Sequence, residues 1–176
     1  ATNLYDARKQ QVLAEARQAT ASAQQLFDSS VTQTGTIDVE AANQAAQLAI
    51  SNVTASPGGS QLAILRTPGQ VAQQTMAARP SMGLDLSVIS EELRDQVAAD
   101  DGVLYSQAVS IPEEERVDPG IVVGSALEVP TAGQYELYLI YNVRDVQETL
   151  DFVQQILVIG SLLLIGTIGL VTYFVV

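Results

Sequence analysis

The sequence predicts an α+β domain in residues 1–151, followed by a transmembrane helix in residues 152–176. Apolar side chains recur at helical spacing through the first third of the chain. Residues 103–143 instead form β-rich runs separated by Pro and Gly. The last 21 residues, 156–176, carry no charge. The expected order is a long helix, a helix, a strand, a helix, three antiparallel strands and an exit helix, which makes one sheet flanked by helices.

The first predicted helix covers Leu4–Thr34, a stretch without Gly or Pro that Gly35 would end. Its apolar residues lie three, four and seven positions apart, so they share one face of the helix. That face is formed by Tyr5, Val12, Leu13, Ala16, Ala19, Thr20, Ala23, Leu26 and Phe27. Two interpretations of the face remain open at this stage. It packs on its own domain, or it packs against a second copy in a dimer.

Asp38 is the expected N-cap of a second helix, which ends before the Ser-Pro-Gly-Gly loop of residues 56–59. Alternation in residues 61–67 predicts a strand that the following Pro-Gly turns. Residues 70–86 give no periodic signal, so we expect a loop with at most a short helix or a poorly formed strand.

Ser90 precedes two glutamates, which is the pattern of a helix start with carboxylates in the first turn. Leu93 and Val97 would face inward from this third helix, and Asp101-Gly102 would end it. The helix therefore separates the first predicted strand from the β-rich part of the chain.

Three strands are predicted after this helix, at Val103–Ile111, Ile121–Val129 and Gln134–Val143. An acidic loop is expected at residues 112–116, and Pro119-Gly120 is expected to precede the second of the three strands. The last strand alternates, with Ala132-Gly133 as the turn before it. One face carries Tyr135, Leu137, Leu139 and Tyr141, and the other carries Glu136, Tyr138, Ile140 and Asn142.

The composition excludes several classes of function. Twenty acidic residues against eight basic ones give a net charge of −12, which disfavours nucleic acid and anionic lipid headgroups as partners. The chain has no Cys and no His, so it has no disulfide, no thiolate metal site and no phosphohistidine. We expect no catalytic residue in this chain.

The uncharged segment 156–176 would span about 30 Å as a helix, the thickness of a bilayer's hydrocarbon core. A buried core helix is the alternative. The expected helix begins at Asp145 and continues into the membrane, with two glutamines at headgroup depth and glycines that let a partner helix approach. The positions expected to act in transmembrane signalling are Asp145, Gln154, Gln155, Gly160, Gly166 and Gly169.

Two groups of side chains are weak candidates for binding. Carboxylate oxygens are suitable ligands for a divalent cation, but the dense acidic group matches no calcium loop, and a solvated loop is the preferred interpretation. That group is Glu113, Glu114, Glu115 and Asp118. Tyrosines on the strands would line a small-molecule pocket, although ordinary core packing is the simpler interpretation. They are Tyr105, Tyr135, Tyr138 and Tyr141.

The clearest resemblance to a known family lies in residues 119–155. The segments PGIVVG (119–124), VP (129–130), AG (132–133) and YELYLIY (135–141) are followed by Gln147-x-Thr149-Leu150 and Phe152-Val153-Gln154. This stretch resembles the region before the second transmembrane helix of MtrB-type actinobacterial sensor histidine kinases. The predicted element order also resembles extracytoplasmic PAS-like domains of the PDC or single-Cache type.

The resemblance implies a plasma-membrane receptor with residues 1–151 outside the cell, acting as a homodimer. It further implies cytoplasmic HAMP and kinase domains beyond these residues, which use ATP and Mg²⁺, autophosphorylate on His and phosphorylate the response regulator MtrA. An envelope lipoprotein, LpqB, is an implied partner. The alternatives are the ligand-binding domain of a chemoreceptor and a non-signalling, membrane-anchored envelope adaptor.

Overall fold

The computed structural model describes residues 2–30, 38–55, 60–70, 75–99, 102–113, 116–130, 132–143 and 161. Within them the chain forms α-helices and one antiparallel sheet, which confirms the predicted α+β class. The helices are α1 (Thr2–Asp28), α2 (Val39–Thr54) and α3 (Glu91–Ala98), with a 3₁₀ turn, η1, at Leu86–Val88. The strands are β1 (Gln61–Arg66), β2 (Arg79–Pro80), β3 (Tyr105–Glu113), β4 (Arg116–Val129) and β5 (Gly133–Asn142).

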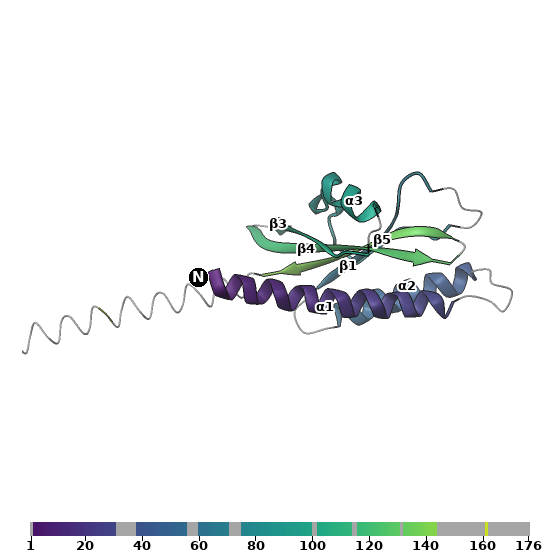
Figure 1. The fold of residues 1–176 in the computed structure, drawn as a ribbon, viewed down its shortest axis with the longest axis horizontal. Helices are drawn as coiled ribbons and strands as arrows, with labels where there is room; N and C mark the ends of the chain where they lie inside the picture. Colours follow the sequence, from purple (N-terminus) through teal and green to yellow (C-terminus); the bar gives the residue numbers. More distant parts are fainter. Residues whose placement is uncertain are drawn as a thin grey trace, which may run out of the picture.

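The sheet has the strand order β2-β1-β5-β4-β3, so the last described strand is the central one. Leu139 of β5 pairs with Leu62 of β1 on one side and with Val123 of β4 on the other. Helices α1 and α2 cover one face of the sheet and α3 covers the other (Figure 1). Because both faces are covered, β5 is buried over most of its length.

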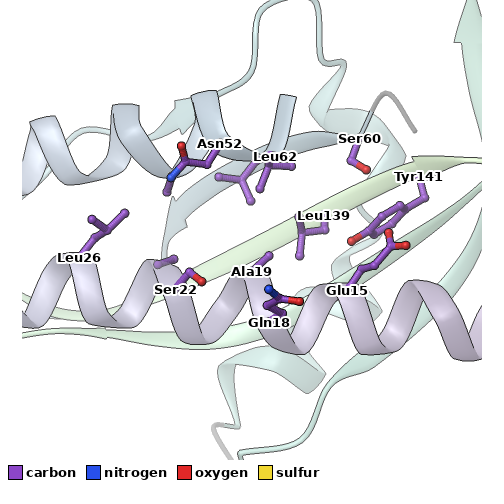
Figure 2. A pocket seen from close by; sticks show the side chains of 13 residues that line it. Glu15, Gln18, Ala19, Ser22, Leu26, Asn52, Ser60, Leu62, Leu139 and Tyr141 are labelled. Carbon is purple, nitrogen blue, oxygen red and sulfur yellow. The ribbon is translucent and has the colours of Figure 1, made fainter. Parts of the chain in front are cut away.

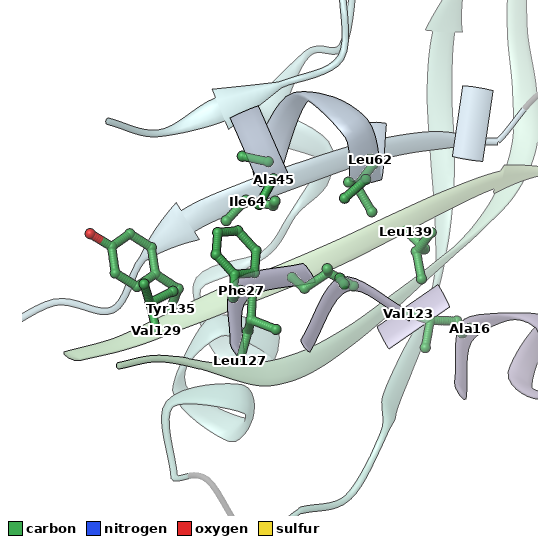
Figure 3. Close-up of a cluster of buried hydrophobic side chains, with 14 of the residues drawn as sticks. Ala16, Phe27, Ala45, Leu62, Ile64, Val123, Leu127, Val129, Tyr135 and Leu139 are labelled. Carbon is green, nitrogen blue, oxygen red and sulfur yellow. The ribbon is translucent and has the colours of Figure 1, made fainter. Parts of the chain in front are cut away.

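The predicted apolar face of the first helix is used inside the domain. Val12, Ala16, Ala23 and Phe27 of α1 are buried against the sheet and α2. Figure 3 shows the Phe27 ring among the side chains that rise from the sheet, with Ala16 nearer the start of α1. The spacing of the four residues follows the 3.6-residue helical period, so they share one face of α1. Because this face is already buried within one chain, its burial needs no second copy.

Helix α1 is shorter than predicted, since it ends at Asp28 and not at Thr34. The two residues after it are serines whose hydroxyls bond back to the last turn. Ser29 Oγ donates to Leu26 O at 2.7 Å, and Ser30 Oγ donates to Phe27 O at 2.6 Å. Such side-chain bonds compete with the helical backbone pattern. Residues 31–34 lie outside the described residues.

The predicted starts of the other helices are confirmed. The Asp38 carboxylate accepts hydrogen bonds from the backbone N–H groups of Glu40 and Ala41 at the start of α2. Ser90 Oγ accepts from Leu93 N at 3.1 Å at the start of α3. Side-chain oxygens thus satisfy backbone donors that lack a helical partner. Leu93 and Val97 face the sheet, as predicted.

The predicted strand boundaries around residues 112–120 are wrong. Strand β4 begins at Arg116 and runs through Pro119-Gly120, opposite Ser110 and Val109 of β3. Pro119 is tolerated because its carbonyl still accepts a bond, from Val143 N at 3.0 Å, although it has no N–H to give. Strand β3 likewise extends through Pro112, which an edge strand allows.

Between Arg66 and Ser90, the structure contains the short elements that the sequence left open. Strand β2 has two residues and η1 has three, and the intervening Gly83 has a φ of 78°. The side chain of Asp85 caps η1 by accepting from Ser87 N at 2.9 Å. These elements carry the chain from the edge of the sheet to the face that α3 covers.

The predicted exit and transmembrane helix falls almost wholly outside the described residues, which resume after Val143 only at Ser161. The positions Asp145, Gln154, Gln155, Gly160, Gly166 and Gly169 all lie outside them. Within the described part of the chain, the helices are too short or too polar to cross a membrane.

Candidate functional site

A cavity of about 520 Å³ lies between the two N-terminal helices and the sheet. Leu62 of β1 and Leu139 of β5 form its floor, and side chains from the two helices, several of them small, form its walls (Figure 2). The small wall residues are Ala19, Ser22 and Ala23 from α1 and Ala49 from α2. The cavity exists because side chains of this size do not fill the space that the larger Phe27 fills farther along α1.

One end of the cavity is polar. Tyr141 of β5 and Glu15 of α1 lie close together there, with Gln18 beside them (Figure 2). The side chain of Tyr141 is buried, with 3% of its surface exposed, yet its hydroxyl has no hydrogen-bond partner among the described residues. Glu15 accepts one bond, from Gln11 Nε2 to Oε1 at 2.8 Å. The remaining polar groups are therefore available to a molecule in the cavity.

The electrostatics of this end keep Tyr141 neutral. Burial, and then the charge of the nearby Glu15 carboxylate, raises the pKa of Tyr141 to about 12, while Arg8 acts in the opposite direction. At neutral pH the hydroxyl is therefore a hydrogen-bond donor that can also accept. A neutral donor and a carboxylate at one end of a cavity with an apolar floor form a combination that can fix the orientation of a small ligand.

The opposite face of the sheet holds a buried carboxylate, Glu136. Its Oε2 accepts from Arg94 Nε of α3 at 2.8 Å and from the Tyr138 hydroxyl at 2.9 Å. The hydrogen bond with Glu136 is the main reason that the pKa of Arg94 is raised. Burial, and then the charge of Glu136, raises the pKa of Tyr138. The ion pair ties α3 to the central strand.

Glu136 also borders a second hollow, of about 390 Å³, beside α3. Arg94, Asp95 and Ala98 of α3 line it together with Pro68. The Oε1 atom of Glu136 is buried and has no hydrogen-bond partner among the described residues. A single water molecule is sufficient to satisfy such an atom.

The predicted acidic group is not gathered into a site in the described part of the chain. Asp118 is buried on β4 and accepts a hydrogen bond from Asn142 Nδ2 of β5 at 2.9 Å. Glu114 and Glu115 lie outside the described residues, and so does the side chain of Glu113. No group of three metal-ligating side chains occurs among the residues that the structure describes.

The predicted group of tyrosines is divided between the two faces of the sheet. Tyr135 and Tyr141 belong to the core under α1 and α2, whereas Tyr105 and Tyr138 lie on the α3 side. Tyr135 is a core residue whose hydroxyl bonds to Met76, accepting from the backbone N at 2.7 Å. Only Tyr141 reaches the cavity, so the four do not line one pocket.

Helix α1 runs alongside β4 and against the direction of β5. Thr20 Oγ1 lies 2.9 Å from Ser125 Oγ, and Gln24 bonds to the backbone of Glu128 farther along both elements. Tyr141, at the end of β5, instead lies near Arg8 and Glu15 in the first half of α1. Figure 1 shows the beginning of α1 and the end of β5 at the same end of the domain. The entering and leaving elements therefore meet beside the polar end of the cavity.

Comparison with known proteins adds no assignment. A scan against protein-family models finds no match, and a search of curated proteins finds no significant similarity.

The sequence did not predict the ion pair on the α3 face or the position of Glu15 at the cavity. Glu136 is the only charged residue within β5, which was a visible signal of a special environment. Nothing in the sequence connects it with Arg94, 42 positions earlier. Glu15 was equally hidden, because it lies between residues of the apolar face of α1 and is followed by the buried Ala16.

Proposed function

We propose that this chain is the sensing portion of an MtrB-type sensor histidine kinase, with a PAS-like extracytoplasmic domain. One observation carries the proposal: the beginning of α1 and the end of β5 lie together at one end of the domain, beside a cavity that both elements border. A receptor whose sensing domain lies between two membrane segments needs its entering and leaving elements close together. The long first helix and the central last strand also suit the PAS-like assignment.

Signalling would act through the packing of α1 on the sheet. Thr20 and Ser125 join their hydroxyls between α1 and β4, and Gln24 holds the backbone of Glu128. A molecule in the cavity would favour one separation of helix and sheet over another, which shifts the population of two packings. Such a shift would reach the end of β5 directly, because Tyr141 borders the same cavity.

The rest of the proposed receptor follows from the resemblance in residues 119–155. Cytoplasmic HAMP and kinase domains would use ATP and Mg²⁺ to phosphorylate their own His and then an MtrA-like response regulator. The receptor would be a plasma-membrane homodimer, and an LpqB-like lipoprotein would be a partner on the outer surface. The chain itself has no His to serve as the phosphoacceptor.

A reversible clamp of α1 on the sheet tests this proposal. The chain has no cysteine, so Thr20→Cys/Ser125→Cys introduces the only thiols into these 176 residues. The two native hydroxyl oxygens are 2.9 Å apart, and a small shift would bring two sulfur atoms to bonding distance. In membranes that contain the full-length gene product, oxidation should change ATP-dependent His autophosphorylation by about fivefold or more, and reductant should reverse the change.

The matched control is Glu128→Cys/Gln134→Cys, which links two residues that are already opposite each other in β4 and β5. That disulfide does not join α1 to the sheet, so it should leave autophosphorylation nearly unchanged. A full-length product without autophosphorylation on His would refute the kinase assignment. Equal responses to the two disulfides would refute signalling through α1.

A further inference from the structure

The cavity between α1, α2 and the sheet has the size and the lining of a small-molecule site. Its volume of about 520 Å³ falls within the usual range for ligand pockets, about 300–1,000 Å³. Leu62, Leu139 and Ala49 give it an apolar floor and wall. Glu15 and Tyr141 supply polar groups at one end, while Ser22 and Asn52 lie nearer Leu26 at the other. An occupant with an apolar body and one polar head can place its body over this floor and its head at the Tyr141 end.

The polar groups beside Tyr141 determine which ligand head group fits this end of the cavity. The Tyr141 hydroxyl has no hydrogen-bond partner among the described residues, and in Figure 2 it is directed into the cavity. Glu15 keeps its Oε2 atom available, since its bond from Gln11 uses Oε1. A primary ammonium has three N–H donors and can give one to the carboxylate and one to the phenolic oxygen. A carboxylate head would be repelled by Glu15.

Arg8 is the basic residue near this end, but it does not reverse the preference for an ammonium over a carboxylate head group. Its effect on the Tyr141 hydroxyl is weaker than that of Glu15 and opposite in sign. Glu15 lines the cavity, whereas Arg8 is absent from its lining. The chain as a whole carries a net charge of −12, which further favours cations over anions near its surface.

We infer that this cavity binds a small amphipathic amine, with its ammonium group between Glu15 and Tyr141 and its apolar body over Leu62 and Leu139. The inference names the class of stimulus and so rests on the proposed sensing function. The walls of small residues on α1 and α2 leave room for a body about the size of one aromatic ring.

Three probes of similar shape test the head group: phenethylamine, 2-phenylethanol and 3-phenylpropanoate. The 176-residue chain in zwitterionic lipid nanodiscs, labelled at Ala and Leu methyl groups, is titrated with each probe by NMR. Phenethylamine should shift the methyl signals of Ala19, Ala49, Leu62 and Leu139 and should bind tightest. The alcohol should bind more weakly, and the carboxylate should bind weakest.

Two variants separate the protein's contribution from partition into lipid. Glu15→Gln should weaken the binding of phenethylamine about threefold to fivefold, because the charge of the carboxylate is lost. It should leave the affinity for 2-phenylethanol unchanged, because that probe carries no charge. Tyr141→Phe should weaken both probes about fivefold, because it removes one hydrogen-bonding group. Glu92→Gln, an exposed site on α3, is the control and should change neither affinity.

The inference is overturned if no probe shifts the cavity methyl signals, if the carboxylate binds as tightly as the amine, or if Glu15→Gln leaves the amine affinity unchanged. These binding measurements are independent of the disulfide experiment at Thr20 and Ser125, in which kinase activity is measured. A working clamp without amine binding would retain the sensing function and refute the ligand class. Amine binding in a product without kinase activity would retain the ligand class and refute the kinase assignment.

Discussion

The two faces of the central strand bury polar groups in different ways. On the α3 face, the buried carboxylate of Glu136 is held by Arg94 and by the Tyr138 hydroxyl. On the face covered by α1 and α2, the buried side chains are mostly apolar, and the Tyr141 hydroxyl opens into a cavity without a partner among the described residues. One strand thus carries a fixed polar network on one side and an unfilled space on the other.

This difference indicates which face is suited to change. An ion pair buried against the sheet resists rearrangement, because separating its partners leaves a charge in a region of low dielectric. A cavity walled by small side chains tolerates small helix movements and can accept a molecule at little steric cost. The α3 face therefore serves as the rigid support, while α1 and α2 form the responsive side. The following substitutions test that division.

The largest expected effect comes from breaking the ion pair. Arg94→Met removes the cation and leaves the fully buried Glu136 with the Tyr138 hydroxyl as its one remaining partner in the described part of the chain. Removing one member of a buried pair costs about 3–5 kcal/mol, and the partial exposure of Arg94 lowers the expectation to about 2–3 kcal/mol. Urea unfolding followed by circular dichroism measures this loss of unfolding free energy.

The control for that loss is the double variant Arg94→Met/Glu136→Met. Replacing both charges by apolar groups removes the unpaired carboxylate, so most of the stability should return. A double variant as unstable as the single one would show that Arg94 acts through packing and not through its charge. The rigid support would then be apolar, and the contrast between the two faces would weaken.

The next largest effect comes from enlarging one side chain on each face of the sheet, with opposite expected outcomes for stability. At Gly124 an added Cβ would lie 2.6 Å from Val97 Cγ2 and 2.8 Å from Tyr138 Cε1, so Gly124→Ala should cost about 1–2 kcal/mol. Ala49→Leu directs a larger side chain into the cavity, where it should be neutral or stabilise by about 0.5–1 kcal/mol. Thermal unfolding of the two variants compares them directly. A loss of more than 1 kcal/mol for Ala49→Leu would mean that the cavity is not available space.

Local signals in the sequence were sufficient for the type of most elements. Asp38 and Ser90 begin their helices as predicted, because capping depends on residues only two or three positions away. The alternation from Tyr135 to Tyr141 correctly predicted the last strand and its two faces, although not its central place in the sheet. Pro119-Gly120 was wrongly expected to precede the strand. Both residues lie within β4, because the neighbouring strands β3 and β5 allow them there. Gly120 lacks space for a Cβ beside Ile111 and Tyr141 O, so its role is set by packing across strands.

The candidate site was much less predictable than the fold. The cavity depends on how α1 and α2 lie over β1 and β5, and of these segments α1 and β5 are more than 100 positions apart. The tyrosines looked equivalent in sequence, yet the strand's alternation sends Tyr138 to the ion pair and Tyr141 to the cavity. Only the pairing of strands and the placement of helices give these two residues their different environments.

The smallest expected effect concerns alkaline pH, where the two tyrosines are again distinct. Tyr141 has a folded-state pKa of about 12 and an ordinary pKa of 10 when unfolded. Its contribution to stability is therefore complete below pH 10 and declines as the pH rises toward 12. The groups that face its hydroxyl are Glu15, which raises the pKa, and Arg8, which lowers it. Tyr141→Phe should flatten the decline in unfolding free energy between pH 10 and 12.

Urea unfolding at pH 8, 10 and 11 measures this change in slope. Six tyrosines and one lysine titrate in this range, so the comparison needs a second variant on the other face. Tyr138→Phe should also flatten the decline, but it should lower stability at pH 8 as well, because it removes the hydrogen bond to Glu136. Tyr141→Phe should leave stability at pH 8 nearly unchanged, since its hydroxyl has no partner among the described residues. Equal losses at pH 8 would show that the cavity side is as firmly hydrogen-bonded as the α3 side, and the proposed division of the sheet into a rigid and a responsive face would be wrong.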